Sequence, residues 1–149
     1  MRVFILEDDP RRIAIFREHL PCQLDITDQV DLAMEWLNTN KYDYIFLDHD
    51  LEGRQYVDSD EFNTGATVAR RLHETPNKKL SIIVHSLNLR GAKVMMREMR
   101  NKDMECHYCP FGGSKFADVI EKTKKRIKLM AGTNEEEEAV RGIGENRQT

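Results

Sequence analysis

The sequence has neither a long hydrophobic run nor an excess of basic residues. The apolar residues after Arg2 give way to acids at residues 7–9, so we expect neither a signal peptide nor a membrane anchor there. No apolar run comes near the roughly 20 residues that cross a bilayer. The formal net charge of −3 offers no basic patch of the kind that binds double-stranded DNA. These absences favour a soluble globular protein that contacts neither a membrane nor duplex DNA.

Cysteine is scarce as well, with three residues in the whole chain. An odd number of cysteines without an export signal favours reduced thiols and a cytoplasmic location. Two of them lie in the segment CHYC at 106–109, whose side chains are of the types that bind zinc. No second CxxC pair accompanies this segment, so we do not expect a zinc site there.

The length and composition predict one domain followed by a tail. With 149 residues, 40% apolar and 33% charged, the chain is long enough for a single core and too short for two comfortable ones. Residues 133–149 contain the run EEEE and show no hydrophobic period and no aromatic residue. We therefore expect a folded domain over 1–132 and a disordered acidic tail over 133–149.

Short apolar runs alternate with segments of helical period along the predicted domain. The runs that predict strands are 2–6, 23–27, 44–47, 81–84 and 105–108. The segments that predict helices are 10–20, 28–40, 65–74, 88–101 and 114–132. This alternation predicts βαβ units and an α/β fold, with a parallel sheet covered by helices on both faces. One long polar loop, 48–65, interrupts the pattern, and loops of that length are usually functional or disordered.

Polar side chains follow several of the predicted strands at the point where each strand ends. These side chains are Glu7, Asp8 and Asp9; Asp48, His49 and Asp50; His85 and Ser86; and Cys109. Because the carboxyl ends of parallel strands open on one edge of a sheet, we expect these groups to share a cleft. Carboxylates gathered in one place repel each other unless protons or a cation neutralise them, and such oxygen ligands suit Mg²⁺ or Mn²⁺. The alternative is that the acids only cap helices, as Asp9 would before Pro10.

Three of these segments resemble a known family. RVFILEDDPRRIAIF is similar to the opening of a response-regulator receiver domain, with Glu7 and Asp8 in the positions of its acid pair. YDYIFLDHDL resembles the strand that carries the phospho-accepting aspartate, here Asp48, and SIIVHS resembles the strand that ends in a phosphate-contacting hydroxyl, here Ser86. The resemblance covers about residues 1–130. It implies a doubly wound (βα)5, flavodoxin-like or receiver-like fold, with five parallel strands in the order 2-1-3-4-5.

The sequence also departs from ordinary receivers. Cys109 stands where the family has a lysine, the loop after Asp50 is roughly ten residues longer, and His49 and His85 lie beside the acids. The segments LDHDL, NTG and VHSLN resemble a divergent branch, the cyclic-phosphate processing receiver domains. This resemblance implies hydrolysis or recognition of a cyclic phosphate in place of phosphorelay.

For such a metal-assisted phosphoesterase or binder, we assign roles to residues near the strand ends. The expected ligands of a divalent metal, Mg²⁺ or Mn²⁺, are Glu7, Asp8, Asp48 and Asp50. Histidines can exchange protons near neutral pH, so the expected catalytic residues are Asp48, His49 and His85. The expected substrate-binding residues are Ser86, Asn88 and Arg54.

The expected partner is a phosphate-containing small molecule, such as a cyclic nucleotide, or an RNA end with a 2′,3′-cyclic phosphate. A protein partner stays open. Two alternatives remain: a single-domain signalling receiver phosphorylated on Asp48, and a non-catalytic pseudo-receiver interaction module. The missing lysine counts against the first, because that charge couples phosphorylation to the receiver's conformational switch.

Overall fold

The computed structural model describes the backbone of residues 1–146 and the side chains of residues 1–132. At its centre is a five-stranded parallel sheet in the order β2-β1-β3-β4-β5. The strands are β1 (Arg2–Leu6), β2 (Gln23–Thr27), β3 (Tyr44–Leu47), β4 (Ile82–Val84) and β5 (Cys106–Tyr108). The predicted fold class and strand order are confirmed.

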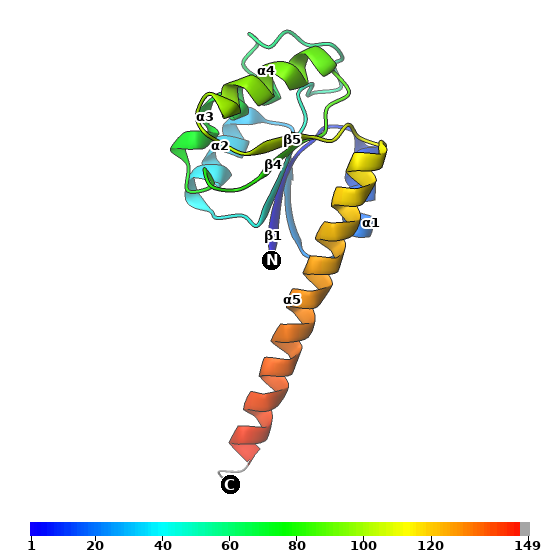
Figure 1. Cartoon of the computed structure of the whole chain (residues 1–149), viewed down its shortest axis with the longest axis vertical. Helices are drawn as coiled ribbons and strands as arrows, with labels where there is room; N and C mark the ends of the chain where they lie inside the picture. Colours follow the sequence, from blue (N-terminus) through cyan, green and yellow to red (C-terminus); the bar gives the residue numbers. More distant parts are fainter. Residues whose placement is uncertain (147–149) are drawn as a thin grey trace.

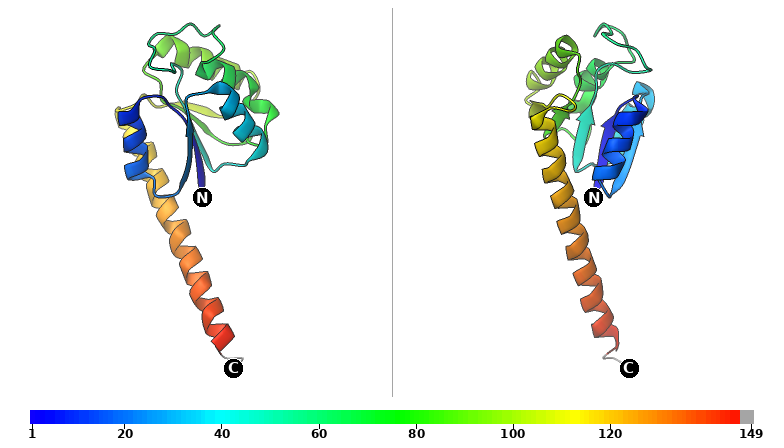
Figure 2. Two further views of the ribbon diagram at one scale, coloured as in Figure 1. Left: turned by 180° about the vertical axis from the view of Figure 1, so that it is seen from behind. Right: turned by 90° about the vertical axis from the view of Figure 1, so that its right-hand side faces the viewer.

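The helices form two layers, one on each face of the sheet (Figures 1 and 2). α1 (Pro10–His19) and α5 (Ser114–Asn146) cover one face; α2 (Val30–Thr39), α3 (Gly65–Arg71), the short 3₁₀ helix η1 (Leu72–Glu74) and α4 (Leu89–Arg100) cover the other. Successive residues of a strand point to opposite faces, so Val3 and Ile5 pack under α1 and α5, while Phe4 and Leu6 pack under α2, α3 and α4. Burial on both faces explains why the central strands are continuous apolar runs.

α5 is much longer than the apolar pattern of its sequence predicts. Its core contacts come from Phe116, Ile120 and Ile127, yet its backbone stays helical to Asn146 and extends well past the sheet (Figure 1). Residues 133–146 were predicted to be disordered; their glutamates and alanine are strong helix formers, which explains the continued helix. Residues 147–149 of that predicted tail lie outside the described residues, and the domain boundary at residue 132 stays a prediction. Of the helices that the structure describes, none combines the length and apolarity needed to cross a membrane.

The long loop between β3 and α3 is tied to the carboxyl edge of the sheet. The Gly53 N–H donates to Asp8 Oδ2 at 2.5 Å, and near the other end of the loop Asn63 Oδ1 accepts from the N–H of Val30, which begins α2, at 2.8 Å. The backbone turns at Tyr56 and Gly53, whose φ angles are +53° and +72°. The loop is therefore an ordered series of turns that stands above the strand ends.

Candidate active site at the carboxyl edge of the sheet

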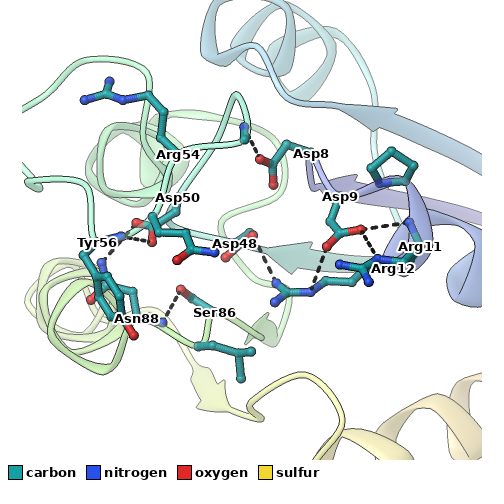
Figure 3. A pocket seen from close by; sticks show the side chains of 14 residues that line it. Asp8, Asp9, Arg11, Arg12, Asp48, Asp50, Arg54, Tyr56, Ser86 and Asn88 are labelled. Atoms are coloured by element: carbon teal, nitrogen blue, oxygen red, sulfur yellow. Dashed lines mark hydrogen bonds and ion pairs between the residues drawn. The ribbon is translucent and has the colours of Figure 1, made fainter.

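A cavity of about 480 Å³ lies at the edge where β1, β3 and β4 end. Figure 3 shows the side chains that surround it, which come from these strand ends, from the first turn of α1 and from the long loop. Of the predicted site residues, the structure places Asp8, Asp48, Asp50, Arg54, Ser86 and Asn88 in its lining. Glu7, His49 and His85 are buried behind it.

Glu7 and Asp48 form a buried acid pair beneath the cavity. They are 1% and 3% exposed, and burial raises the pKa of each carboxyl to about 7. Glu7 is held by the turn that follows β1, because its Oε2 accepts from the N–H groups of Asp8 at 2.9 Å and Asp9 at 3.2 Å. Asp48 Oδ1 accepts from the N–H of His49 at 2.8 Å. The pair is therefore fixed in place but incompletely neutralised.

The acid pair offers a donor set that fits a hard divalent cation. One ligand atom from each of Glu7, Asp48 and His85 lies within 4.8 Å of the others, and the Asp8 carboxylate faces the cavity beside them (Figure 3). Carboxylate oxygens with room for water are the ligands that Mg²⁺ and Mn²⁺ prefer. The high pKa of the buried pair indicates that a further positive charge there would be stabilising.

Asp50 is occupied by the loop. Its carboxylate accepts from the N–H groups of Tyr56 at 2.7 Å and Val57 at 3.2 Å, and from Asn88 Nδ2 at 3.0 Å. Burial alone would raise the pKa of Asp50, but hydrogen bonds from His49, Asn88 and Tyr56 lower it. The predicted metal ligand is thus the residue that shapes the loop.

His49 belongs to the same loop-holding network. The imidazole is fully buried, with Nδ1 2.7 Å from Asp50 Oδ1 and Nε2 2.9 Å from Ser59 Oγ. Its ring packs against the first turn of α4, where a Cβ on Gly91 would come within 2.4 Å of it. Both ring nitrogens are satisfied by protein, so His49 positions the loop. Ser59, its partner, was missed from the sequence because a serine within a polar loop carries no distinguishing pattern.

His85 holds Glu7 from below. Its Nε2 lies 3.1 Å from Glu7 Oε1, and its ring is enclosed by Phe16, Phe111 and Phe116. Complete burial lowers the pKa of His85 to about 4, so the ring is neutral near pH 7 and its Nε2 shares a hydrogen bond with the Glu7 carboxyl group. Nδ1 of the ring is buried as well, and no described residue hydrogen-bonds to it. The geometry does not bring the two predicted catalytic histidines to opposite sides of the cavity.

The predicted substrate-binding residues differ in how available they are. Ser86 Oγ accepts from the Asn88 N–H at 3.1 Å and borders the cavity. Asn88 caps α4, because its Oδ1 accepts from the Gly91 N–H at 3.0 Å. The Arg54 guanidinium pairs with Glu61, with a hydrogen bond of 2.9 Å, and points away from Asp48 (Figure 3).

Arg12 is a further site residue that sequence reasoning missed. Its Nη1 lies 3.6 Å from both Glu7 Oε1 and Asp48 Oδ2, and its guanidinium covers the Phe111 ring at 5.1 Å. Cys109, which replaces the family lysine, is buried among apolar side chains. One signal was present: a cation in the first turn of a helix is opposed by the helix dipole, so helix stability does not account for an arginine at that position.

Comparison with known proteins agrees with this geometry. The family model of the cyclic-phosphate processing receiver domain matches residues 1–101. A CheY-like receiver domain from Methanospirillum hungatei JF-1 superposes with a TM-score of 0.57 and 14% identity, over 89% of this chain and 97% of that one. The receiver domain of the sensor histidine kinase PA1611 from Pseudomonas aeruginosa PAO1 was solved with a magnesium ion coordinated in its active-site cleft. It superposes with a TM-score of 0.56 and 15% identity, over 83% of this chain and 97% of that one. The search of curated proteins found no significant match. The chain belongs to the family of cyclic-phosphate processing receiver domains.

Proposed function

We propose that the cavity binds a cyclic phosphate together with a divalent cation, Mg²⁺ or Mn²⁺. The observation that carries this proposal is the buried Glu7–Asp48 acid pair, in which both carboxyls have a raised pKa and Asp48 borders a cavity of about 480 Å³. The family description names cyclic phosphates, and a magnesium ion is coordinated in the cleft of the PA1611 receiver domain. Both support the choice of ligand and ion.

In this proposal the cation is held by Asp48 and Asp8, with Glu7 behind them. The bound ion supplies positive charge to the phosphate oxygens. Asp8 is held at the cavity by the Gly53 N–H. The Glu7 carboxylate is held in position by the backbone of the β1–α1 turn and by His85. These contacts orient the carboxylates before any ligand arrives.

The remainder of the cavity suits a small phosphoester. Its volume lies within the range of small-molecule pockets, and the Ser86 hydroxyl can donate a hydrogen bond to a phosphate oxygen. Tyr56 stands at the rim with 81% of its surface exposed, so its ring is free to stack on a base. A cyclic nucleotide or a 2′,3′-cyclic RNA end has this combination of phosphate and base.

The side chains favour recognition over hydrolysis. Opening a phosphodiester needs groups that exchange protons with the attacking and leaving oxygens, and neither His49 nor His85 borders the cavity. Asp48 borders the cavity and its pKa of about 7 suits proton exchange, but in this proposal its carboxylate is occupied by the cation. Signalling by phosphorylation of Asp48 is less favoured, because Cys109 supplies no charge at the position of the receiver lysine.

Isothermal titration of the purified protein with cyclic mononucleotides and 2′,3′-cyclic nucleotides, with and without Mg²⁺, tests this proposal. We expect binding that needs Mg²⁺ and is lost in Asp48→Asn, while Asp118→Asn on the exposed surface of α5 binds normally. Phosphorus NMR of the same mixtures reports ring opening. If none of the cyclic phosphates binds in a Mg²⁺-dependent manner, the proposal is refuted. Rapid ring opening would show that the site hydrolyses its ligand and does not only bind it.

A further inference from the structure

We propose that Arg12 is the phosphate-binding cation of this site and that, until an anion arrives, its guanidinium serves as the counter-charge of the Glu7–Asp48 pair. The proposal rests on the function proposed above and adds a residue role to it. It implies that Arg12 opposes the binding of a divalent cation alone and favours the binding of cation and phosphate together.

The geometry of Arg12 is that of a loose ion pair. Its guanidinium lies 3.6 Å from one oxygen of Glu7, 3.6 Å from one oxygen of Asp48 and 4.0 Å from Asp9 Oδ2. Each of these separations exceeds the usual length of a charge-assisted hydrogen bond, about 2.7–2.9 Å. Arg12 therefore offsets the charge of the acids only in part and is not locked to any one of them.

The hydrogen-bond donors of this guanidinium are available to a ligand. Among the residues whose side chains are described, none accepts a hydrogen bond from the Arg12 side chain, although Arg12 borders the cavity and is 22% exposed. A guanidinium presents its donors as a planar fork that matches two oxygens of a phosphate. Its position over the Phe111 ring restricts the side chain to a stacked orientation, which reduces the entropy lost on binding.

The other cations that line the cavity are less suited to this role. The Arg11 side chain is 92% exposed and lies 3.6 Å from Asp9, whereas the charge of Arg54 is already matched by Glu61. Figure 3 shows the Arg12 guanidinium between Asp9 and Asp48, and Arg54 on the far side of the cavity. Within the described part of the chain, Arg12 is the lining cation closest to the acid pair.

The proposed role has a thermodynamic signature. A divalent cation near Asp48 repels the guanidinium, while a phosphate attracts it away from the acids. Phosphate binding should therefore raise the affinity for the cation, and by linkage the cation should raise the affinity for phosphate by the same factor. Direct attraction between the bound cation and the phosphate also couples the two affinities, so the part of the coupling that belongs to Arg12 is the part that Arg12→Met removes.

Isothermal titration of the full chain with Mg²⁺ in the absence of phosphate tests the counter-charge role. Arg12→Met should bind Mg²⁺ on the order of tenfold more tightly than the unmodified protein, because a repelling unit charge has been removed. Arg12→Lys, which keeps the charge, and Arg17→Met, which removes an exposed charge of α1 that does not line the cavity, should each change the affinity by less than about twofold. Equal or weaker Mg²⁺ binding by folded Arg12→Met overturns the proposal, and Arg12→Gln, which removes the same charge but stays polar, is used in its place should the methionine variant fold poorly.

Titration with inorganic phosphate at saturating Mg²⁺ tests the anion-binding role. Arg12→Met should lose about tenfold or more in affinity, since charge-assisted hydrogen bonds are removed, and Arg17→Met should match the unmodified protein. Unchanged phosphate affinity in Arg12→Met would overturn the proposal even where cyclic phosphates bind. An unmodified protein that binds Mg²⁺ and inorganic phosphate with the expected Arg12 dependence, but no cyclic phosphate, would uphold this inference and refute the proposed function.

Discussion

The protonation state of Asp48 should affect the stability of the metal-free fold. An isolated aspartate has a pKa of 3.8, and burial raises that of Asp48 to about 7. The unfolded chain releases this proton near pH 4 and the folded chain only near pH 7, so the group destabilises the metal-free fold as pH rises through that window. Mg²⁺ should offset this loss of stability by supplying positive charge beside the ionised carboxylate.

The first prediction follows from this fall in stability with rising pH. In metal-free protein, Asp48→Asn should raise Tm by on the order of 5 °C at about pH 8, and much less near pH 4, because only the ionised carboxylate carries the burial penalty. Thermal unfolding across this pH range, in the presence of a chelator, measures the difference between variant and parent. An equal difference at both ends of the range would contradict the raised pKa.

His85 gives a second prediction at the same scale. The side chain fills a space between three phenylalanine rings and orients Glu7, so His85→Ala should cost about 2–4 kcal/mol of unfolding free energy through the cavity that it leaves. His107, which is exposed, is the matched control and should change stability by less than about 0.5 kcal/mol on replacement by alanine. Urea denaturation distinguishes the two; a neutral His85→Ala would show that the ring is not packed as described.

At the scale of the element, the first turn of α4 is seated directly on His49. A Cβ at Gly91 would come within 2.4 Å of the His49 ring, while a Cβ at Gly132 in α5 meets nothing within 4 Å. Gly91→Ala should therefore destabilise the fold by about 1–3 kcal/mol through overpacking, and Gly132→Ala should be neutral or stabilising by up to about 1 kcal/mol because alanine favours helix. Chemical denaturation measures the unfolding free energy of both variants. Similar changes in the two would contradict the close contact between Gly91 and His49.

The long loop supports a prediction about local order. Asp50 accepts from the N–H groups of Tyr56 and Val57, so Asp50→Ala should speed amide hydrogen exchange in residues 52–57 by about tenfold or more. Asp58→Ala, which removes the exposed carboxylate that accepts from the Asp60 N–H, leaves these amides bonded. Exchange measured by mass spectrometry should show the difference, and unchanged protection in Asp50→Ala would mean that other contacts hold the loop.

At the scale of the whole molecule, the sheet and its layers were predictable and the site only in part. An apolar run such as YIFL predicts a strand that is buried on both faces of a parallel sheet, and these strands are indeed almost fully buried. That Glu7 and Asp48 lie together at one edge follows from the parallel topology alone. The histidines could not be placed, because a strand-end position does not tell whether a ring turns toward the cavity or into the core. Arg12 was missed because its role arises from a contact across elements, between α1 and the ends of β1 and β3.

The extent of the domain along α5 is testable by truncation. Among the α5 residues whose side chains are described, Ile127 is the last one in the core, whereas Met130 is exposed. A chain ending at residue 132 should unfold within about 2 °C of the full chain, while Ile127→Ala should lower stability by about 2–4 kcal/mol. Calorimetry of the two proteins makes the comparison. A large loss on truncation would show that the rest of α5 contributes to the fold, directly or through association of copies.

The two attachments of the long loop also bear on how this protein could be altered by design or by evolution. Asp8 holds the loop at Gly53, and Val30 holds it at Asn63, so both anchoring partners belong to the rigid βα units. Doubling the length of a flexible loop costs only about 0.6 kcal/mol in closure entropy. The residues between these two attachments can therefore be exchanged as a cassette, provided that the cassette keeps a hydroxyl at position 59 for His49 and the N–H groups of residues 56 and 57 for Asp50. Such an exchange would change the ligand bound at the rim while leaving the acid pair and the sheet intact.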